Sequence, residues 1–186
     1  MPFDHFGLIA PIFSRAEYSS LETMLRRADL PTPGRVLDAG GGTGRVASAI
    51  REHARGVVIA DPSLGMLRQA DRTRLELACS NSESLPFPND FFERVIMVDA
   101  LHHVIDQRHT AREMYRVLKP GGRIVIEEPD IRSFYVKMIA LAEKLLLMRS
   151  HFLSPDKIVD LFSFDSASTS VHAAEGNAWV VIEKPE

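Results

Sequence analysis

The residues with the clearest chemical pattern lie early in the chain, where residues 36–44 read VLDAGGGTG. An apolar run ends there in Asp38 and passes into four glycines. Glycine adopts positive φ angles and lets a ligand approach the backbone closely. From Arg45 to Glu52, apolar side chains recur at helical spacing. A strand, a glycine turn and the N-terminus of a helix in this order predict a nucleotide-binding corner.

The spacing of the glycines narrows the choice of nucleotide. Residues 42–47 read GTGRVA and fit the GxGxxG/A pattern, so a nicotinamide or flavin cofactor stays open from this loop alone. No Gly-Lys-Ser/Thr follows the loop, which excludes a P-loop for nucleoside triphosphates. The fuller spacing, Asp38-x-Gly40-x-Gly42-x-Gly44, resembles the first motif of the class I S-adenosylmethionine (SAM) dependent methyltransferases.

The acidic residue in this motif agrees with the resemblance. SAM has no phosphate; it carries an ammonium, a carboxylate, a sulfonium cation, a ribose and an adenine. A helix N-terminus suits the carboxylate, and the side chain of Asp38 suits the ammonium or the sulfonium but would repel a pyrophosphate. The resemblance therefore implies that Asp38, Gly40, Gly42 and Gly44 hold the amino-acid end of SAM.

A second apolar run, residues 56–60, ends in Asp61. It follows the glycine loop at about the distance, roughly 20 residues, from which a carboxylate binds ribose hydroxyls in a Rossmann-like unit. Pro62 opens the next helix, and Met66 on that helix is either an adenine contact or a core methionine. We predict that Asp61 binds the ribose and that Pro62 and Met66 belong to the same site.

Residues 80–88, which read SNSESLPFP, follow the third predicted strand. The methyltransferase family commonly has Gly-Asp-Ala-Glu-x-Leu-Pro-Phe here, with the Asp accepting a hydrogen bond from the adenine amino group. Asn81 takes that position, and its amide oxygen accepts the same bond as a weaker, neutral acceptor. The resemblance implies that Asn81 and Ser82 hold the adenine. This motif is not expected in a dinucleotide-dependent oxidoreductase, so it favours SAM as the ligand.

Two adjacent histidines follow the fourth predicted strand. Residues 100–103 read ALHH, as in many small-molecule methyltransferases, and the resemblance places Asp99 and Ala100 beside the sulfur. An imidazole with a pKa near 6.5 can remove a proton from an attacking hydroxyl or carbon acid. One of the pair can instead satisfy a backbone group inside the protein. We name His102 and His103 as candidate catalytic residues and predict no metal, because their spacing matches no usual ligand set.

Composition limits the remaining possibilities. The chain has 186 residues, 45% hydrophobic and 25% charged, which suits one soluble domain. It has no apolar run long enough to span a membrane and no secretory leader, and its net charge of −3 gives no sign of a nucleic-acid partner. A single cysteine, Cys79, cannot form an internal disulfide, so we expect a cytoplasmic protein. A lone cysteine at the end of an apolar strand favours a thiol packed in the core over a catalytic one.

The elements that position these residues predict the fold. Strands and helices alternate, which indicates an α/β, Rossmann-like, seven-stranded, mostly parallel sheet with helices on both faces and a C-terminal antiparallel hairpin. We expect one domain over residues 1–186. Its parts are an N-terminal helical lid (1–34), the SAM-binding core (35–129), acceptor-side helices (130–161) and the closing hairpin (162–186).

Two segments are tied to acceptor choice. Residues 133–149 are apolar on most sides of a predicted helix, which favours a pocket wall but leaves a dimer seam or peripheral membrane contact open. Glu127 and Glu128 end the fifth predicted strand, where we expect one to border the acceptor pocket and the other to be exposed. The sequence leaves a monomer and a homodimer equally open.

The resemblance covers roughly residues 35–184 and is closest to the ubiquinone/menaquinone biosynthesis branch (methyltransferase type 11). It implies methyl transfer from SAM to a small, apolar or aromatic acceptor, with S-adenosylhomocysteine as product. An NAD-dependent oxidoreductase and a non-catalytic SAM-binding regulatory module stay as alternatives. The acceptor atom, whether O, N or C, is not predicted.

Overall fold

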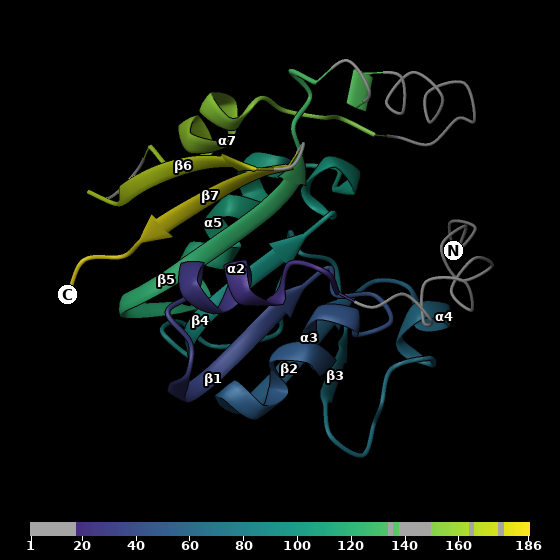
Figure 1. Ribbon diagram of the computed structural model, residues 1–186. Coiled ribbons are helices and arrows are strands. Elements are labelled where there is room, and N and C mark those ends of the chain that lie inside the picture. The colour runs from purple at the N-terminus through teal and green to yellow at the C-terminus, as the bar shows by residue number, and fades with distance from the viewer. Residues whose placement is uncertain (1–17, 134–135, 138–149, 164–165, 175–176) are drawn as a thin grey trace.

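The computed structural model describes residues 18–133, 136–137, 150–163, 166–174 and 177–186. The first half of the expected N-terminal lid and most of the apolar segment 133–149 lie outside these residues. Figure 1 shows the described chain as one twisted sheet with helices on both sides.

Seven strands form the sheet in the spatial order β3-β2-β1-β4-β5-β7-β6. They are β1 (Thr32–Ala39), β2 (Ala54–Asp61), β3 (Glu76–Cys79), β4 (Phe92–Val98), β5 (Leu118–Pro129), β6 (Ser168–Ala174) and β7 (Asn177–Glu183). Strands β1 to β5 are parallel to one another, while β7 is antiparallel to both β5 and β6. The predicted Rossmann-like sheet with a C-terminal hairpin is confirmed.

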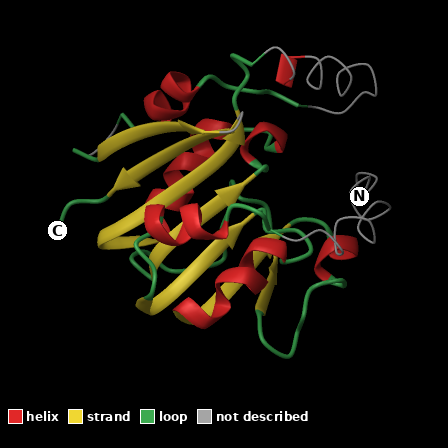
Figure 2. Ribbon diagram, viewed as in Figure 1, coloured by secondary structure: helices red, strands yellow, loops and turns green. Residues whose placement is uncertain are grey.

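Helices cover both faces of the sheet (Figure 2). The helices are α2 (Leu21–Arg27), α3 (Arg45–Ile50), α4 (Leu64–Leu67), α5 (Gln107–Val117) and α7 (Pro155–Leu161), with short 3-10 turns η1 (Arg51–His53) and η2 (Leu101–His103). One buried cluster contains residues of α2, α3 and α4, and the other contains residues of α5 and α7. Both faces of the central strands are therefore core, which is why those strands read as continuous apolar runs.

The chain direction across the sheet reverses beside β1. From β1 the chain moves outward through β2 to β3, then returns to β4 on the other side and continues to β5. In such sheets the ligand crevice lies outside the carboxyl ends of the strands at this reversal point. The loops after β1, β2, β3 and β4 meet at this edge.

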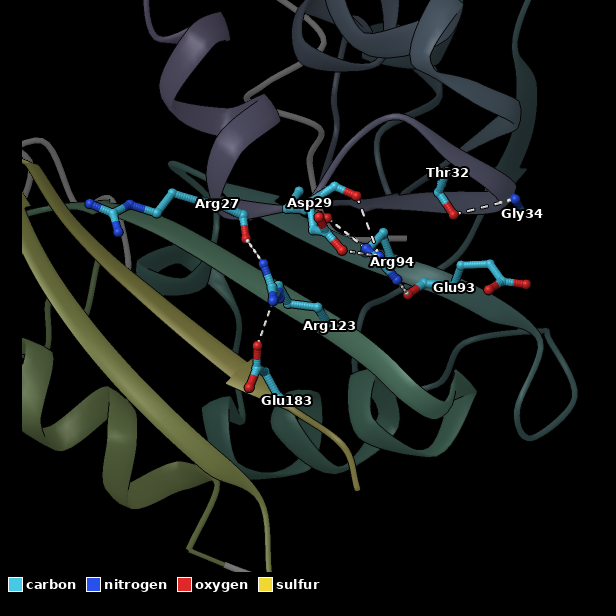
Figure 3. Close-up of polar contacts among 9 residues, drawn as sticks. Arg27, Asp29, Thr32, Gly34, Glu93, Arg94, Arg123 and Glu183 are labelled. Atoms are coloured by element: carbon cyan, nitrogen blue, oxygen red, sulfur yellow. Dashed lines mark hydrogen bonds and ion pairs between the residues drawn. The ribbon is translucent and has the colours of Figure 1, made fainter. Parts of the chain in front are cut away.

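Ion pairs within the chain lie at the opposite end of the parallel strands from this crevice (Figure 3). Arg94 donates to the carboxylate of Asp29 at 2.9 Å. Arg123 donates to the backbone carbonyl of Arg27 at 3.0 Å and pairs with Glu183. A shallow polar hollow lies here, but both arginines are committed to holding the turn after α2, so they do not form a ligand site.

Candidate functional site

The glycine loop connects β1 to α3 with left-handed backbone angles at Gly40 (φ 72°) and Gly44 (φ 79°). A Cβ added at Gly40 would lie 2.7 Å from the Cβ of Ala100, and one at Gly44 would lie 2.8 Å from Cδ1 of Ile59. These two glycines are therefore needed for both backbone conformation and close packing.

Gly42 differs from Gly40 and Gly44 because there is open space where its Cβ would be. Its φ is 56°, yet an added Cβ would meet only the Asp61 carboxylate and the Met66 methyl, each at 3.9 Å. The loop thus opens toward the end of β2 and the start of α4. A side chain here would fill the cradle in which we predict a ligand.

Asp38 ends β1 as a buried carboxylate, only 1% exposed. Its Oδ2 accepts a hydrogen bond from the Ala47 backbone N–H at 3.2 Å, and its Oδ1 has no partner among the described residues. Burial raises the pKa of Asp38 to about 7, opposed by the Ala47 N–H and by Arg45. A buried acceptor without a donor is unfavourable, and a cationic ligand group would satisfy it.

Asp61 is held beside the glycine loop by two backbone donors. Its Oδ2 accepts from the Gly42 N–H at 2.9 Å and its Oδ1 from the Ser63 N–H at 2.8 Å. These two bonds hold the carboxylate beside the open position of the loop, and a carboxylate accepts hydrogen bonds from hydroxyl groups. Ser63 caps α4 by accepting from the Met66 N–H at 3.1 Å, which fixes Met66 near the loop. Pro62 between them is exposed.

The loop after β3 lies against the end of β2, because the Ser80 N–H donates to the Asp61 carbonyl at 3.2 Å. Asn81 is exposed, while Ser82 is buried with 4% exposure. Cys79, at the end of β3, is exposed. The prediction that this thiol packs in the core is therefore wrong, because β3 is a short strand at the edge of the sheet.

The end of β4 lies next to the end of β1, at the point where the strand order reverses. Asp99 adopts φ 51°, and its N–H donates to the Glu127 carbonyl at 2.9 Å. Its side chain pairs with Arg45 of α3 at 3.3 Å. The loops after β1 and β4 are thus joined by an ion pair next to the glycine cradle.

Glu127 and Glu128 are both buried, with 2% and 3% exposure. The expectation that one of them is exposed is therefore wrong. They end a central strand with a packed layer on each face, so successive side chains both point into protein. Glu127 accepts from the Tyr18 hydroxyl at 2.6 Å and from the Asn177 amide at 2.8 Å. Burial raises the pKa of both Glu127 and Tyr18.

Glu128 faces the turn after β4. Its Oε1 accepts from the backbone N–H groups of Ala100 at 2.9 Å and Leu101 at 2.7 Å, and its Oε2 lies 2.5 Å from Nδ1 of His102. The His102 side chain is 5% exposed and its ring stacks on Phe152 with centroids 4.2 Å apart. Glu128 and Phe152 therefore enclose the His102 ring and leave little of it accessible to a methyl-accepting substrate.

His103 lies nearer the surface and is half-buried. Its Nδ1 is 3.4 Å from the Ser150 hydroxyl. Burial, followed by the neighbouring His102, lowers the pKa of His103 to about 3, so the imidazole is neutral at physiological pH. The sequence marked both histidines as candidate bases, but only the structure separates their environments.

Neither a metal centre nor a membrane span is present in the described part of the chain. Among those residues, no three His, Cys, Asp or Glu side chains are placed to hold a metal ion. In the same residues, no helix is long and apolar enough to cross a membrane.

Comparison with known proteins gives a family match over the core of the sheet. Residues 37–126 match the family model described as "Methyltransferase domain". Demethylmenaquinone methyltransferase of Corynebacterium urealyticum is 39% identical over 128 residues, covering 67% of this chain and 54% of the relative. The enzyme of the same name from Clavibacter sepedonicus is 42% identical over 137 residues, covering 67% and 56%. The chain thus spans about half the length of these curated relatives.

Solved structures share the fold at low sequence identity. The YcgJ protein of Bacillus subtilis aligns with a TM-score of 0.77 at 20% identity, covering 90% of this chain and 98% of that one. The [4+2]-cyclase SpnF aligns with a TM-score of 0.79 at 16% identity, covering 97% and 93%. At these identities the likeness shows the fold alone.

Proposed function

Because the chain belongs to the methyltransferase family matched over residues 37–126, we propose that it transfers a methyl group from SAM to a small, apolar or aromatic acceptor. The observation that carries the proposal is the convergence of Asp38, Gly42 and Asp61 at one edge of the sheet. Three features lie together there: a buried carboxylate oxygen of Asp38 that has no partner within the described chain, an open glycine cradle and a fixed second carboxylate.

The groups at this edge fit the parts of SAM. Asp38 would pair with the ammonium or the sulfonium, because its buried Oδ1 has no partner among the described residues. Asp61 would accept from the ribose hydroxyls, since backbone bonds from Gly42 and Ser63 hold its carboxylate beside the glycine loop. Three further contacts complete the proposed site. Met66 and Pro62 would lie beside the adenosine, Asn81 and Ser82 would hold the adenine, and Asp99 and Ala100 would border the sulfur.

The chemistry asks little of reactive side chains. When bound, SAM would supply an electrophilic methyl group to an in-line attack by the acceptor, with S-adenosylhomocysteine as the leaving group. The protein has to align the acceptor and exclude water. His102 is closed in by Glu128 and Phe152, so we place any contact with the acceptor at His103. The neutral imidazole of His103 would accept a hydrogen bond from a hydroxyl group of the molecule to be methylated and so orient it. The low pKa of His103 makes the imidazole a weak base.

A hydroxylated aromatic ring is the acceptor class that we propose. The two relatives described above are named demethylmenaquinone methyltransferases, and a reduced naphthoquinone is such a ring. Because the chain spans about half of their length, the identity of the acceptor is part of the proposal.

Turnover with labelled SAM tests this function. The protein is incubated with methyl-labelled SAM and a panel of reduced naphthoquinones, phenols and aliphatic amines. The proposal predicts label in the aromatic hydroxylated products. Label in the amines alone, or none at all, would contradict it.

A thermal shift assay separates the alternatives. A ligand at 100 times its dissociation constant stabilises a protein by about 2.7 kcal/mol, so S-adenosylhomocysteine should raise the melting temperature and NAD should not. A shift with NAD alone would favour an oxidoreductase. A shift with S-adenosylhomocysteine but no turnover on any acceptor would favour the non-catalytic SAM-binding module.

A further inference from the structure

We propose that Glu128 is a positioning residue for the methyl transfer: it fixes the turn after β4 and the ring of His102, and through them it sets the rim where His103 lies. The inference rests on the proposed function. It concerns a residue outside the predicted donor site.

One buried carboxylate holds three donors here. Glu128 is 3% exposed at the end of β5. It accepts from the N–H groups of Ala100 and Leu101 with one oxygen, and its other oxygen lies 2.5 Å from Nδ1 of His102. A buried carboxylate is stable only when its lone pairs are satisfied. The turn η2 is therefore folded around this side chain.

The same contact sets the tautomer of His102. Glu128 already accepts from two backbone N–H groups, so we infer that it is the acceptor toward His102 as well, and that Nδ1 of His102 carries the hydrogen. A carboxylate that orients an imidazole in this way fixes both its ring plane and its protonated nitrogen. The ring of His102 packs against Phe152 on one side and lies 4.0 Å from the ring of His103.

The turn also connects this carboxylate to the donor edge. Ala100 packs above Gly40, where an added Cβ would lie 2.7 Å from the Ala100 Cβ. The N–H of His103 donates to the Ala100 carbonyl at 3.0 Å. A displacement of Glu128 would therefore move Ala100, which packs against Gly40, and His103 together.

A second glutamate provides a matched control. Glu83 accepts from the backbone N–H groups of Ile105 at 2.8 Å and Asp106 at 3.2 Å, just after the same turn. Glu83 therefore holds two consecutive backbone N–H groups as Glu128 does, and a single oxygen, Oε1, accepts both bonds. The bond to a histidine is found at Glu128.

The experiment compares Glu128→Gln with Glu83→Gln. In each variant the amide oxygen can keep the two backbone bonds, but in Glu128→Gln the new amide NH₂ would donate to Nδ1 of His102 and force its other tautomer. We expect Glu128→Gln to lower kcat about 10-fold or more, with the KM for SAM and the melting temperature close to wild type. Glu83→Gln should keep the wild-type kcat. Nitrogen NMR of the histidines should show a hydrogen on Nδ1 of His102 in wild type and an unprotonated Nδ1 in Glu128→Gln.

Each result bears on a different claim. An unchanged kcat in Glu128→Gln, or the Nε2–H tautomer in wild type, would overturn the inference while the proposed function stands. An equal loss of kcat in both glutamine variants would also overturn it, because backbone clamping alone would then explain the effect. No turnover by wild type on any acceptor would overturn the proposed function, and the inference with it.

A histidine pair covers the case in which Glu128→Gln does not fold. His102→Asn keeps an N–H donor near the position of Nδ1, whereas His102→Ala removes it. We expect His102→Ala to lower kcat about 10-fold or more and His102→Asn to restore most of that loss. Equal kcat values in the two variants would overturn the inference.

Discussion

The carboxylate of Asp61 accepts a hydrogen bond from the backbone N–H of Gly42 at 2.9 Å. This bond joins the end of β2 to the open position of the glycine loop. Both residues were predicted to bind the same ligand, and the structure brings them into direct contact. The site is thus preformed by the backbone, and a ligand in the cradle would touch both.

Replacing Asp61 with alanine should weaken the binding of S-adenosylhomocysteine by about 1 to 3 kcal/mol, because two hydroxyl donors of the ribose lose a charged acceptor. Isothermal titration calorimetry measures the change. Asp71→Ala is the control, since Asp71 is exposed and bonds to Thr73. Equal affinities in the two variants would remove Asp61 from the site.

Gly42→Ala should impair binding much more than folding. The added methyl would enter the cradle, whereas the nearest protein atoms are 3.9 Å away and the φ of 56° adds modest strain, about 1 kcal/mol. Gly56→Ala is the control, because Gly56 lies on β2 outside the left-handed region and with ordinary space around its Cβ. Calorimetric affinity and urea unfolding separate the two effects. A Gly42→Ala protein that binds normally would contradict the cradle.

Asp38 should make ligand binding depend on pH. Its pKa is raised to about 7 in the folded protein from an ordinary value of 3.8. Between these values the folded protein holds a proton that the unfolded chain has released, so the free energy of unfolding falls as pH rises through this window. A cationic ligand needs the ionised form, so its affinity should rise as pH increases toward 7.

Asp38→Asn should remove both trends relative to wild type, while other groups contribute equally to the two proteins. The charged residues acting on this carboxylate are Arg45 and Asp61. Affinity and urea unfolding measured from about pH 5 to 8 check the difference, since this range brackets the raised pKa. Parallel pH curves for wild type and Asp38→Asn would show that Asp38 does not titrate in this range.

Tyr18→Phe should lower the free energy of unfolding by about 1 to 3 kcal/mol, because buried Glu127 loses its 2.6 Å hydroxyl donor. Ser168→Ala is a matched control, since it removes an exposed hydroxyl bonded to Glu183 at 3.1 Å. Urea denaturation measures both. Equal stabilities of the two variants would mean that the Tyr18 bond adds nothing.

His103→Ala should lower turnover while the affinity for S-adenosylhomocysteine stays unchanged. The half-buried imidazole is proposed to orient the acceptor and lies outside the donor cradle. Single-turnover kinetics with labelled SAM, beside calorimetry, make the comparison. Wild-type turnover in His103→Ala would exclude His103 from contact with the acceptor.

The sequence predicted the sheet, and it predicted that Asp38 and Asp61 end neighbouring strands, because both depend on local patterns. Apolar runs that end in Asp38 and Asp61 indicate parallel strands, and parallel strands deliver their carboxyl ends to one edge. Capping is a local pattern of the same kind: Asp106 directly precedes α5, and its side chain accepts from the His109 N–H.

Contacts between distant residues were not predictable in this way. Tyr18 and Glu127 are 109 positions apart, and His102 and Glu128 are 26 apart. No periodicity in the sequence pairs them. From the sequence, we expected one of Glu127 and Glu128 to border the acceptor pocket and the other to be exposed. Only the packed layers on both faces of β5 show that each carboxylate needs a buried donor.

A crystal structure of the protein with S-adenosylhomocysteine tests the donor site most directly. We expect the ligand over Gly42, with its ribose hydroxyls about 2.5–3.0 Å from the Asp61 carboxylate and its ammonium on Oδ1 of Asp38. A ligand bound elsewhere, or a cradle closed by protein with Asp38 still unpartnered, would contradict the assignment.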